Sequence, residues 1–225
     1  MEASTALSLW NDSSRKRLVD VLAAGIALTV SSPLMLLAAL AVRIDSPGPV
    51  FFRQRRVGKN GTEFEMLKFR TMFHRSRDGS APLTRKGDSR VTRVGKILRR
   101  WKLDELPQFF NVLRGDMSLI GPRPDLAEFY LKLDSTRRQV LRLKPGITGW
   151  ATLHFRDEES VLASVSPERM IGFYENEVLP KKIDLDLSYA REASLKGDLT
   201  ILLQTFAAIL PTRFAPPTSR HLPLA

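Results

Sequence analysis

Two adjacent carboxylates, Asp104 and Glu105, stand in otherwise basic surroundings and are the residues best suited to chemistry. Their segment, residues 101–124, reads WKLDELPQFFNVLRGDMSLIGPRP. Neighbouring carboxylates raise one another's pKa unless cations compensate, so the pair favours a divalent metal ion and phosphates as ligands. Pro107 is acceptable in the first turn of a helix, whose dipole would stabilise negative charge beside Asp104. From spacing alone, two solvent-exposed acids near a helix start are the simpler alternative.

Cationic side chains that could hold a phosphate stand before and after this pair. Arg123 lies between two prolines in the GPRP turn at residues 121–124, which would present its guanidinium to a phosphate at little entropic cost. Lys68 and Arg70 lie two positions apart on an expected strand, so both side chains should point to one face. A phosphate site and a solvated strand face are equally compatible with that spacing.

The composition is that of a folded, strongly basic protein without cysteine. The chain has 225 residues, of which 43% are hydrophobic, enough for one domain with a modest core and an appendage. A net charge of +11 implies anionic partners, which are nucleic acid, acidic lipid headgroups or phosphorylated substrates. The absence of cysteine excludes disulfides, zinc fingers and thiol catalysis, and it fits a domain that faces the cytosol.

An uncharged apolar segment, residues 21–42, follows a polar leader at residues 1–14 that should be poorly ordered. As a helix the segment would be roughly 33 Å long, enough to cross a bilayer. A secretory signal peptide is a poor interpretation, because the apolar part is too long and residues 47–49 (PGP) do not form a small-residue cleavage site. A helix buried in a soluble core is the remaining alternative.

Two features favour a re-entrant helix, expected over residues 15–43, above a simple span. Ser32-Pro33 lies at the middle of the segment, where the proline should kink the helix and the serine can satisfy a freed carbonyl. Both flanks are basic, and the positive-inside rule places both in the cytoplasm. The flanking cations are Arg15, Lys16 and Arg17 before the segment and Arg43, Arg53, Arg55, Arg56 and Lys59 after it.

Three elements are expected between this segment and the acidic pair. Residues 49–71 read as a β-hairpin whose turn contains Asn-Gly. Residues 74–89 are polar, with glycine and proline, and predict a mobile loop that could close over a substrate. Apolar residues at helical spacing predict an amphipathic basic helix from Val91 to Trp101. Such a helix suits an anionic membrane surface, and a nucleic-acid backbone is the competing partner.

After the GPRP turn the sequence predicts mostly short helices. Residues 125–133 form one, residues 157–169 read as a polar, acidic connection, and a further helical stretch follows. The alternating run PKKIDLDL at residues 180–187 is expected to end that stretch. Residues 194–210 predict a helix that packs on the core or lies at the membrane interface, and residues 211–225 an irregular tail.

Four ordered motifs resemble the bacterial sugar transferases, which are polyprenyl-phosphate phosphoglycosyl transferases. The motifs are GPVFFRQRRVG, FEMLKFRTM, RVTRVGKILRRWKLDELPQFFNVLRGDMSLIGPRP and LKPGITGWA. The resemblance covers residues 15–205, and the chain is similar in size to the small monotopic members. It implies transfer of a sugar-1-phosphate from a UDP-sugar to undecaprenyl phosphate with release of UMP, as the first membrane step of exopolysaccharide, O-antigen or other glycoconjugate biosynthesis.

The resemblance also implies a role for each matching residue. Asp104 matches the nucleophile, which forms a covalent aspartyl-phosphosugar intermediate, and Glu105 matches the residue that coordinates Mg²⁺, so that the metal site comprises Glu105 and Asp104. The phosphate-binding residues are matched by Lys68, Arg70 and Arg123. The residues near the nucleotide are matched by Pro145, Gly146, Thr148 and Gly149. The break in the family's re-entrant helix is matched by Ser32 and Pro33.

One stretch departs from the family pattern. After LKPGITGW the family commonly has a glutamine and a glycine where this chain has Thr152 and Phe155, while Arg156 keeps the arginine of the nucleotide site. We therefore expect nucleotide or sugar contacts here to differ from the usual ones. His154 would be either a substrate contact or a partly buried histidine without a catalytic role.

These observations together predict an α/β, helix-rich α+β fold. It has a re-entrant membrane helix, a β-hairpin and amphipathic interfacial helices around one catalytic domain at residues 44–210. The expected location is the bacterial cytoplasmic (inner) membrane, with the catalytic domain facing the cytoplasm. The expected partners are a UDP-sugar, undecaprenyl phosphate and membrane lipids, with Mg²⁺ as cofactor and no nucleic acid.

The main functional alternative is a non-catalytic basic adaptor at the membrane surface that recruits a glycan-assembly complex. Release of UMP from a UDP-sugar would separate the two functions. The sequence leaves open which sugar is transferred, which glycan is made, and whether the chain forms homo-oligomers or binds glycan-assembly partners.

Overall fold

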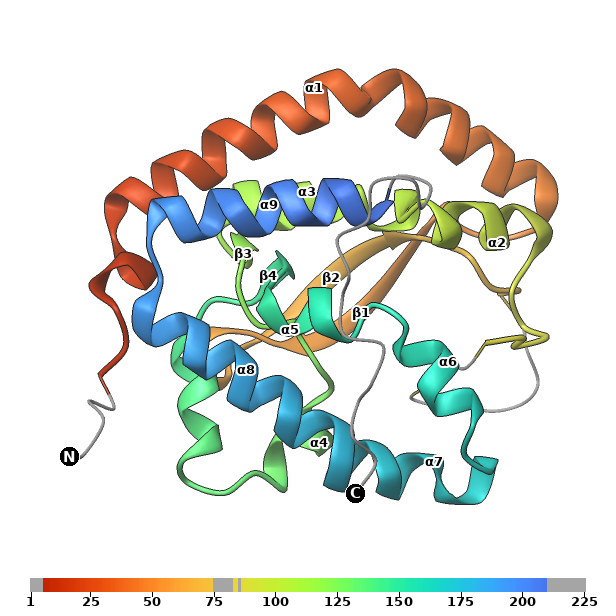
Figure 1. Ribbon diagram of the computed structural model, residues 1–225. Coiled ribbons are helices and arrows are strands. Elements are labelled where there is room, and N and C mark those ends of the chain that lie inside the picture. Colours follow the sequence, from red (N-terminus) through yellow and green to blue (C-terminus); the bar gives the residue numbers. More distant parts are fainter. Residues whose placement is uncertain (1–5, 75–82, 85, 210–225) are drawn as a thin grey trace.

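The computed structural model describes residues 6–74, 83–84 and 86–209. Helices predominate in it, and two two-stranded sheets lie among them (Figure 1). The predicted helix-rich α+β class is therefore confirmed for the described residues. Most of the expected loop at residues 74–89 and the whole expected tail lie outside those residues.

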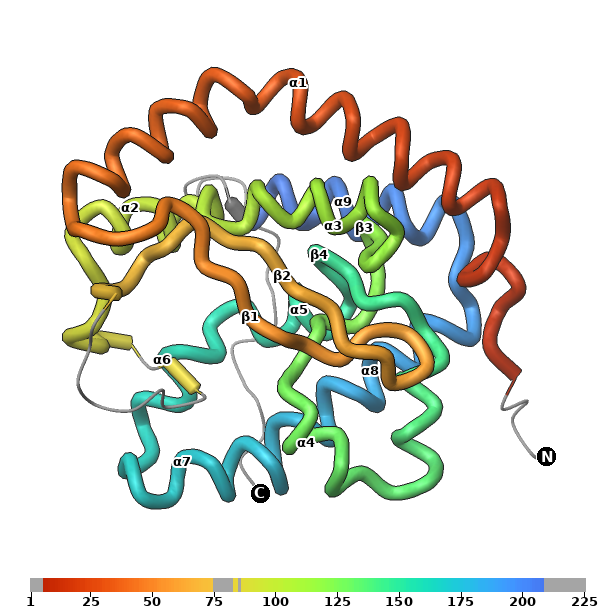
Figure 2. Tube along the Cα trace, turned by 180° about the vertical axis from the view of Figure 1, so that it is seen from behind, coloured from red at the N-terminus to blue at the C-terminus, as the bar shows by residue number. Residues whose placement is uncertain are grey.

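The helix α1 (Ser14–Asp45) arches over the rest of the molecule (Figures 1 and 2). It is long and apolar enough to cross a membrane, and only 11% of its most apolar window is buried. Its buried residues lie toward its two ends: Lys16, Asp20 and Ala24 at the first, Ala38 and Val42 at the second. Both ends therefore pack on one domain, while the middle of the helix exposes its apolar side chains.

Pro33 lies inside α1 and removes one backbone donor from its hydrogen-bond ladder. The carbonyl that loses its partner is that of Thr29, and it accepts a hydrogen bond from the Ser32 hydroxyl at 2.8 Å. The predicted role of Ser32, to satisfy a carbonyl freed by the proline, is thus confirmed. Because the freed carbonyl is satisfied locally, the helix continues through the proline.

The predicted β-hairpin is also confirmed. β1 (Phe51–Val57) pairs with β2 (Glu63–Phe69) in antiparallel register along their whole length. The tip is a short 3-10 helix, η2 (Lys59–Gly61), in which Asn60 and Gly61 have φ values of 57° and 77°. Asparagine and glycine tolerate this left-handed conformation better than other residues, which is why Asn-Gly marks such turns.

Three short helices follow the hairpin. α2 (Arg93–Arg100) leads into the 3-10 helix η3 (Leu103–Glu105) and then into α3 (Gln108–Arg114). The predicted amphipathic helix is confirmed as α2. Both views place α2 and α3 in one row under the arch of α1, together with the last helix, α9 (Leu195–Ile209) (Figures 1 and 2).

The second sheet pairs two segments that are distant in the sequence. β3 (Ser118–Ile120) lies parallel to β4 (Gly146–Thr148). Parallel strands need a crossover connection, and here it contains α4 (Ala127–Leu131) and the 3-10 helix η4 (Arg137–Arg142). The helix predicted at residues 125–133 is confirmed as α4. The crossover brings the GPRP turn after β3 against the LKPGITGW motif.

A series of helices completes the described chain before α9. It consists of α5 (Trp150–His154), α6 (Glu158–Ala163), α7 (Pro167–Phe173), the π-helical turn η5 (Tyr174–Val178) and α8 (Leu179–Glu192). The polar, acidic connection predicted at residues 157–169 is largely helical, because α6 and α7 occupy most of it.

The prediction that residues 180–187 end a helix is wrong. Pro180 occupies the first turn of α8, where a missing N–H costs no helical hydrogen bond. The apparent alternation conceals helical spacing, since Ile183, Leu187 and Ala190 are all buried on one side of the helix. Lys182 and Asp186 are buried too, and this polar content of the buried face hid the helical period.

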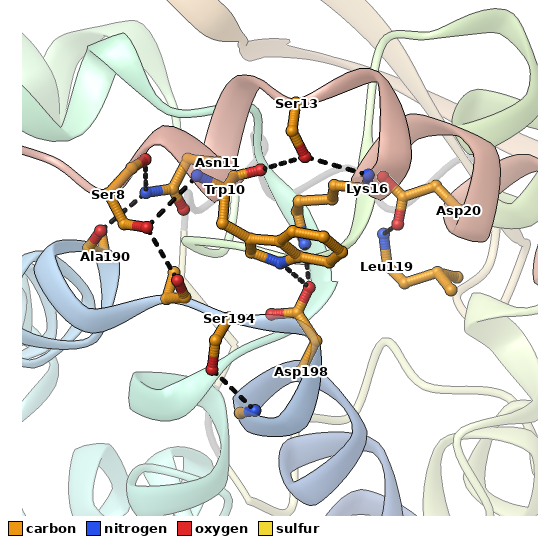
Figure 3. Close-up of polar contacts among 12 residues, drawn as sticks. Ser8, Trp10, Asn11, Ser13, Lys16, Asp20, Leu119, Ala190, Ser194 and Asp198 are labelled. Atoms are coloured by element: carbon orange, nitrogen blue, oxygen red, sulfur yellow. Dashed lines mark hydrogen bonds and ion pairs between the residues drawn. The ribbon is translucent and has the colours of Figure 1, made fainter.

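The residues directly before α1 are held to the C-terminal helices (Figure 3). They form a 3-10 helix, η1 (Leu9–Asp12), in which the Trp10 indole donates to the Asp198 carboxylate at 2.9 Å and the Asn11 amide donates to a carbonyl of α8 at 2.6 Å. Lys16 forms a buried ion pair with the same Asp198. Residues 8–13 thus differ from the poorly ordered leader that the sequence predicted, because their polar side chains have partners on distant helices.

Three clusters of buried apolar side chains form the core. The largest joins α4, η4, η5 and α8, and in it the rings of Phe129 and Tyr174 pack at a tilt with their centroids 5.0 Å apart. The second lies around β3 and includes Ala24 of α1. The third joins Ala38 and Val42 of α1 to the hairpin and to α2. The two ends of α1 therefore belong to two different clusters of the same domain.

Candidate active site

The acidic pair lies in η3, the turn between α2 and α3. Lys102, directly before this turn, has a left-handed backbone with φ 55°. Its carbonyl accepts a hydrogen bond from the N–H of Glu105 at 3.2 Å, which closes the turn. Leu103 and Leu106, on either side of the pair, pack against the apolar cluster of α1, the hairpin and α2. Core packing therefore fixes the backbone that carries both carboxylates.

Glu105 is held by two cations. Its Oε1 atom lies 3.1 Å from Nζ of Lys68 and 2.6 Å from Nη2 of Arg123, and its Oε2 atom lies 3.4 Å from Nη1 of Arg123. Burial alone would raise the pKa of Glu105, but the charges of Arg123 and Lys68 outweigh it and hold the pKa well below its usual range. The two cations therefore favour the ionised form of Glu105.

Asp104, by contrast, is not held by any described partner. Its carboxyl is buried, and its Oδ1 atom has no hydrogen-bond partner among the described residues. Burial raises the pKa of Asp104, and the neighbouring charge of Glu105 raises it further. A buried polar atom without a partner is unusual and calls for an explanation, such as a ligand or a catalytic role. The structure thus separates the pair into one carboxylate held by two cations and one with a buried oxygen that has no partner among the described residues.

Lys68 and Arg70 contact different parts of the molecule. Lys68 lies in β2 and reaches Glu105, whereas Arg70 directly follows the last residue of β2. The Arg70 guanidinium instead donates to carbonyls at the C-terminal end of α1, at 3.3 Å to Val42 and 2.7 Å to Ser46. These contacts give Arg70 the role of a cap on α1.

Arg123 is positioned by the second sheet. The GPRP turn leaves β3 and is bonded on both sides to the LKPGITGW segment, from Gly121 N–H to the Thr148 carbonyl at 3.0 Å and from Gly146 N–H to the Pro122 carbonyl at 2.9 Å. The hydroxyl of Tyr130 in α4 also donates to the Arg123 carbonyl at 3.4 Å. Hydrogen bonds with Thr148, Gly146 and Tyr130 therefore fix the backbone from which the Arg123 side chain extends.

Glycines allow the two motifs to approach this closely. A Cβ atom on Gly146 would lie 2.2 Å from the N atom of Gly121, and one on Gly149 would lie 2.3 Å from the Gly121 carbonyl oxygen. A Cβ on Gly121 would lie 2.3 Å from the carbonyl oxygen of Lys144. All three positions exclude any side chain, because backbone atoms occupy the space.

The residues expected near a nucleotide thus have structural contacts of their own. The Pro145 carbonyl accepts a hydrogen bond from Ser118 N–H at 2.8 Å, and the hydroxyls of Thr148 and Thr205 lie 2.9 Å apart. Gly146 and Gly149 provide the close backbone approach described above. Contact of these residues with a nucleotide stays a prediction.

The stretch that departs from the family pattern, residues 151–156, lies in α5 and the turn after it. Phe155 is a core residue, and the hydroxyl of Thr152 is buried without a partner among the described residues. His154 is exposed, with its Nδ1 atom 2.9 Å from the Trp150 carbonyl oxygen. Arg156 is half-buried, and its Nε atom lies 3.7 Å from the Asp157 carboxylate. A nucleotide contact of Arg156 remains a prediction.

The structure places two further cations near Asp104. The sequence had assigned Arg99 only to the membrane-facing helix and had given Lys102 no role. Arg99 and Lys102 both lie close enough to favour the ionised form of Asp104. Arg99 is engaged elsewhere, at 2.8 Å from the Thr71 hydroxyl and 3.2 Å from Glu159. Helical spacing could have placed Arg99 one and a half turns before Asp104, but no sequence signal separates it from the other arginines of α2.

A buried polar network behind Arg123 was also missed. Asp125, two residues further on, accepts from Arg56 of β1 at 3.0 Å and from the Tyr174 hydroxyl. Lys182 of α8 lies 3.3 Å from that hydroxyl and pairs with Glu158 of α6 at 2.6 Å. These members come from distant segments, so only the tertiary structure could reveal that they fix the end of the GPRP turn.

The two carboxylates fit a magnesium ion that is shared with a substrate. Among the described residues, no three acidic, histidine or cysteine side chains gather as they would around a metal held by protein alone. Mg²⁺ commonly binds through one or two carboxylates together with waters and substrate phosphates. Asp104 offers an oxygen without a partner, and Oε2 of Glu105 has only the long bond to Arg123. This donor set is compatible with Mg²⁺ in that mode.

Comparison with known proteins identifies a family for the chain. The model of the family described as bacterial sugar transferase matches residues 11–212. The chain is 42% identical over 200 residues to a UDP-N-acetylgalactosamine-undecaprenyl-phosphate N-acetylgalactosaminephosphotransferase of Aeromonas hydrophila. That alignment covers 87% of this chain and 43% of the relative, so the chain spans less than half of that protein.

Two further relatives are covered more fully. A UDP-glucose:undecaprenyl-phosphate glucose-1-phosphate transferase of Caulobacter vibrioides is 42% identical over 201 residues, which are 88% of this chain and 70% of the relative. An exopolysaccharide production protein, ExoY, of Rhizobium meliloti is 35% identical over 213 residues, which are 88% of this chain and 86% of the relative. The similarity thus extends over nearly the whole chain, and the acidic pair and the GPRP turn both fall inside it.

Proposed function

The chain belongs to the bacterial sugar transferase family, and from this premise we propose that it transfers a sugar-1-phosphate from a UDP-sugar to undecaprenyl phosphate and releases UMP. Two relatives bear the names of such transferases, with different sugars. A third is named for exopolysaccharide production. The site supports the same chemistry, because it combines a free carboxylate with cations suited to phosphate.

Asp104 is the nucleophile in this proposal. One of its carboxylate oxygens bonds to the sugar-bearing phosphorus while the bond from that phosphorus to the oxygen of UMP breaks, which leaves an aspartyl-phosphosugar intermediate. A phosphate oxygen of undecaprenyl phosphate then bonds to the same phosphorus, and the bond to Asp104 breaks. The second step restores the carboxylate and yields the lipid diphosphosugar.

Glu105, Lys68 and Arg123 prepare the phosphate site. Glu105 holds both cations before the substrate arrives, so little reorganisation is needed when a diphosphate binds. Preorganised cations stabilise the charge that grows on phosphate oxygens during transfer. Mg²⁺ held by Asp104 and Glu105 would add positive charge on the diphosphate and make UMP a better leaving group.

The single observation that carries the proposal is the contrast between the two adjacent carboxylates. A purely structural ion-pair network pairs its buried oxygens, as Glu105 does. Asp104 is buried to 6% exposure and keeps an oxygen without a partner among the described residues. A nucleophile needs such an oxygen, whereas an adaptor protein has no use for it.

We also propose that α1 enters the cytoplasmic membrane and returns to the face it came from. Both of its ends pack on one domain, and its exposed middle is apolar. Basic residues flank both ends, which favours the cytoplasm for each. The catalytic domain would then lie at the headgroup level, where a lipid phosphate and a soluble nucleotide sugar can meet.

The test is UMP release by the purified full chain. With Mg²⁺ and a panel of UDP-sugars, Asp104→Asn is expected to lower release by at least about a thousandfold, because the amide cannot form the covalent intermediate. The control is Asp134→Asn, which changes an exposed carboxylate paired with Arg137 and should retain activity. Intact-mass measurement without acceptor should show one added phosphosugar on the wild type alone.

Two outcomes would contradict the proposal. Undiminished UMP release by Asp104→Asn would remove the nucleophile assignment. No release by the wild type with any UDP-sugar, with or without undecaprenyl phosphate, would favour the adaptor function. Chelation of Mg²⁺ should abolish release and its readdition should restore it, and unchanged activity in chelator would exclude the metal.

A further inference from the structure

Lys102 has an unfavourable backbone conformation for a lysine. Among the described residues, only Asn60 and Lys102 combine a side chain with a positive φ. Asn60 occupies a hairpin turn of the kind that suits asparagine. Lys102 directly follows Trp101, the C-cap of α2, at a position where helices commonly end with a left-handed glycine. A glycine there would remove the steric cost that a Cβ atom incurs in this region.

Strain of this kind persists mainly where function requires the side chain. The side chain of Lys102 is exposed and has no hydrogen bond or ion pair with another described residue. Three cations around the acidic pair are engaged by polar groups, Lys68 and Arg123 by Glu105 and Arg99 by Thr71 and Glu159, while Arg100 lies over the Trp101 ring. Lys102 is thus the cation beside the acidic pair that remains available to a ligand.

Its position is fixed relative to the pair. The Lys102 carbonyl is bonded to the N–H of Glu105, so the ammonium is attached at the edge of the turn that carries both carboxylates. Trp101 before it is 40% exposed, and Ile97 one turn earlier is 59% exposed. Along the chain, Lys102 therefore lies between the exposed Trp101 and the acidic pair.

We propose that Lys102 is a substrate-binding residue that receives a phosphate oxygen, supplied either by the diphosphate of the nucleotide sugar or by the phosphate of the polyprenyl acceptor. This inference rests on the proposed function. An ammonium is suited to the task because it binds phosphate oxygens as a compact charge with three donors. The lysine is kept in a strained position because the ligand needs a cation there, beyond those that Glu105 already holds.

The decisive variant is Lys102→Gly, because it should separate stability from function. Relief of the left-handed strain should leave the thermal midpoint unchanged or raise it by roughly 2–4 °C. Loss of a charged hydrogen bond to substrate should raise the KM for one substrate by about tenfold to about a hundredfold. A rise for the UDP-sugar identifies the nucleotide as the ligand, and a rise for undecaprenyl phosphate identifies the lipid. Lys102→Arg keeps the positive charge, so its KM for that substrate should stay much closer to the wild-type value.

Two control variants isolate the effect. Asn60→Gly removes the other left-handed side chain and should leave both KM values unchanged. Lys96→Ala removes an exposed cation from the same helix, α2, and reports any general attraction of that helix to an anionic membrane. If Lys96→Ala raises the KM for the lipid as much as Lys102→Gly does, or if Lys102→Gly changes neither KM, the inference is overturned.

Binding measurements keep this inference separate from the proposed function. Wild-type protein and Lys102→Gly would be compared for binding to UDP and for sedimentation with vesicles that contain undecaprenyl phosphate. Weaker binding of either probe by the variant supports Lys102 even if no UMP is released. Equal binding of both probes, with normal UMP release by the wild type, refutes the role of Lys102 and leaves the proposed function intact.

Discussion

Asp104 and Glu105 are neighbours in the chain, yet their surroundings shift their pKa values in opposite directions. Glu105 is kept ionised by Lys68 and Arg123, so it can orient cations but is poorly available as a nucleophile. Asp104 has a raised pKa and an oxygen without a described partner. Two identical functional groups thus acquire different roles, because long-range partners reach one of them and not the other.

The pH dependence of UMP release should report the state of Asp104. The reactive form is the carboxylate, and burial raises its pKa, so the single-turnover rate should fall with decreasing pH at a higher pH than for an ordinary aspartate. Glu105→Gln removes the neighbouring negative charge and leaves Lys68 and Arg123 to favour the anion. Whatever activity this variant retains should therefore decline at a lower pH. A decline displaced to higher pH in Glu105→Gln would contradict this account of the pair.

At the scale of elements, the site depends on the contact between two glycine-containing motifs. The GPRP turn carries Arg123. The LKPGITGW segment packs against this turn through backbone hydrogen bonds, at glycines where a side chain would clash. The sequence suggested nucleotide binding for that segment by resemblance. The structure shows in addition how it supports the arginine, because β4 lies beside β3 and its glycines admit the turn.

Gly149→Ala should disturb this contact. The new Cβ would lie 2.3 Å from the Gly121 carbonyl oxygen, so the backbone must shift, at a cost of about 1–3 kcal/mol in the free energy of unfolding. UMP release should fall as well, because the turn that carries Arg123 moves. The control is Gly172→Ala in α7, where nothing lies within 4 Å and a helical alanine should stabilise by about 1 kcal/mol. Equal effects of the two substitutions on stability and activity would refute the packing argument.

At the scale of the whole molecule, α1 is fastened to the domain at both ends. At the first, Lys16 pairs with Asp198 of α9, and the Asp20 carboxylate accepts from Leu119 N–H of β3 at 3.0 Å (Figure 3). At the second, Arg70 donates to the final carbonyls of the helix. Its apolar middle stays free of the domain. This attachment suits a helix that dips into a membrane and returns to the same face.

Cysteine labelling tests that topology. The natural chain has no cysteine, so Ser14→Cys and Arg53→Cys would each introduce a single exposed thiol, one at the first residue of α1 and one after the helix. In intact spheroplasts, both should be protected from a membrane-impermeant maleimide, and both should react after permeabilisation. Labelling of one and not the other in intact spheroplasts would establish a simple span.

Local patterns in the sequence were sufficient for several elements. Uncharged residues 21–42 predicted α1, Asn-Gly predicted the hairpin turn, and helical spacing predicted α2 and α4. In each case the deciding interactions lie within a few residues, as in the bond from Ser32 to the carbonyl freed by Pro33. The failures had non-local causes. Lys182 and Asp186 hid the period of α8, because their burial depends on partners in α6 and at α5.

By itself, the sequence determined the chemical groups of the site and their order along the chain: an acidic pair, a stiff arginine turn, a basic helix and an apolar helix broken by proline. Only the tertiary structure decided how those groups share the work. It pairs Lys68 with Glu105, places the Arg70 guanidinium at the end of α1, and leaves Asp104 without a described partner. Pairing of charges depends on distances across the fold, and residues far apart in the sequence set those distances.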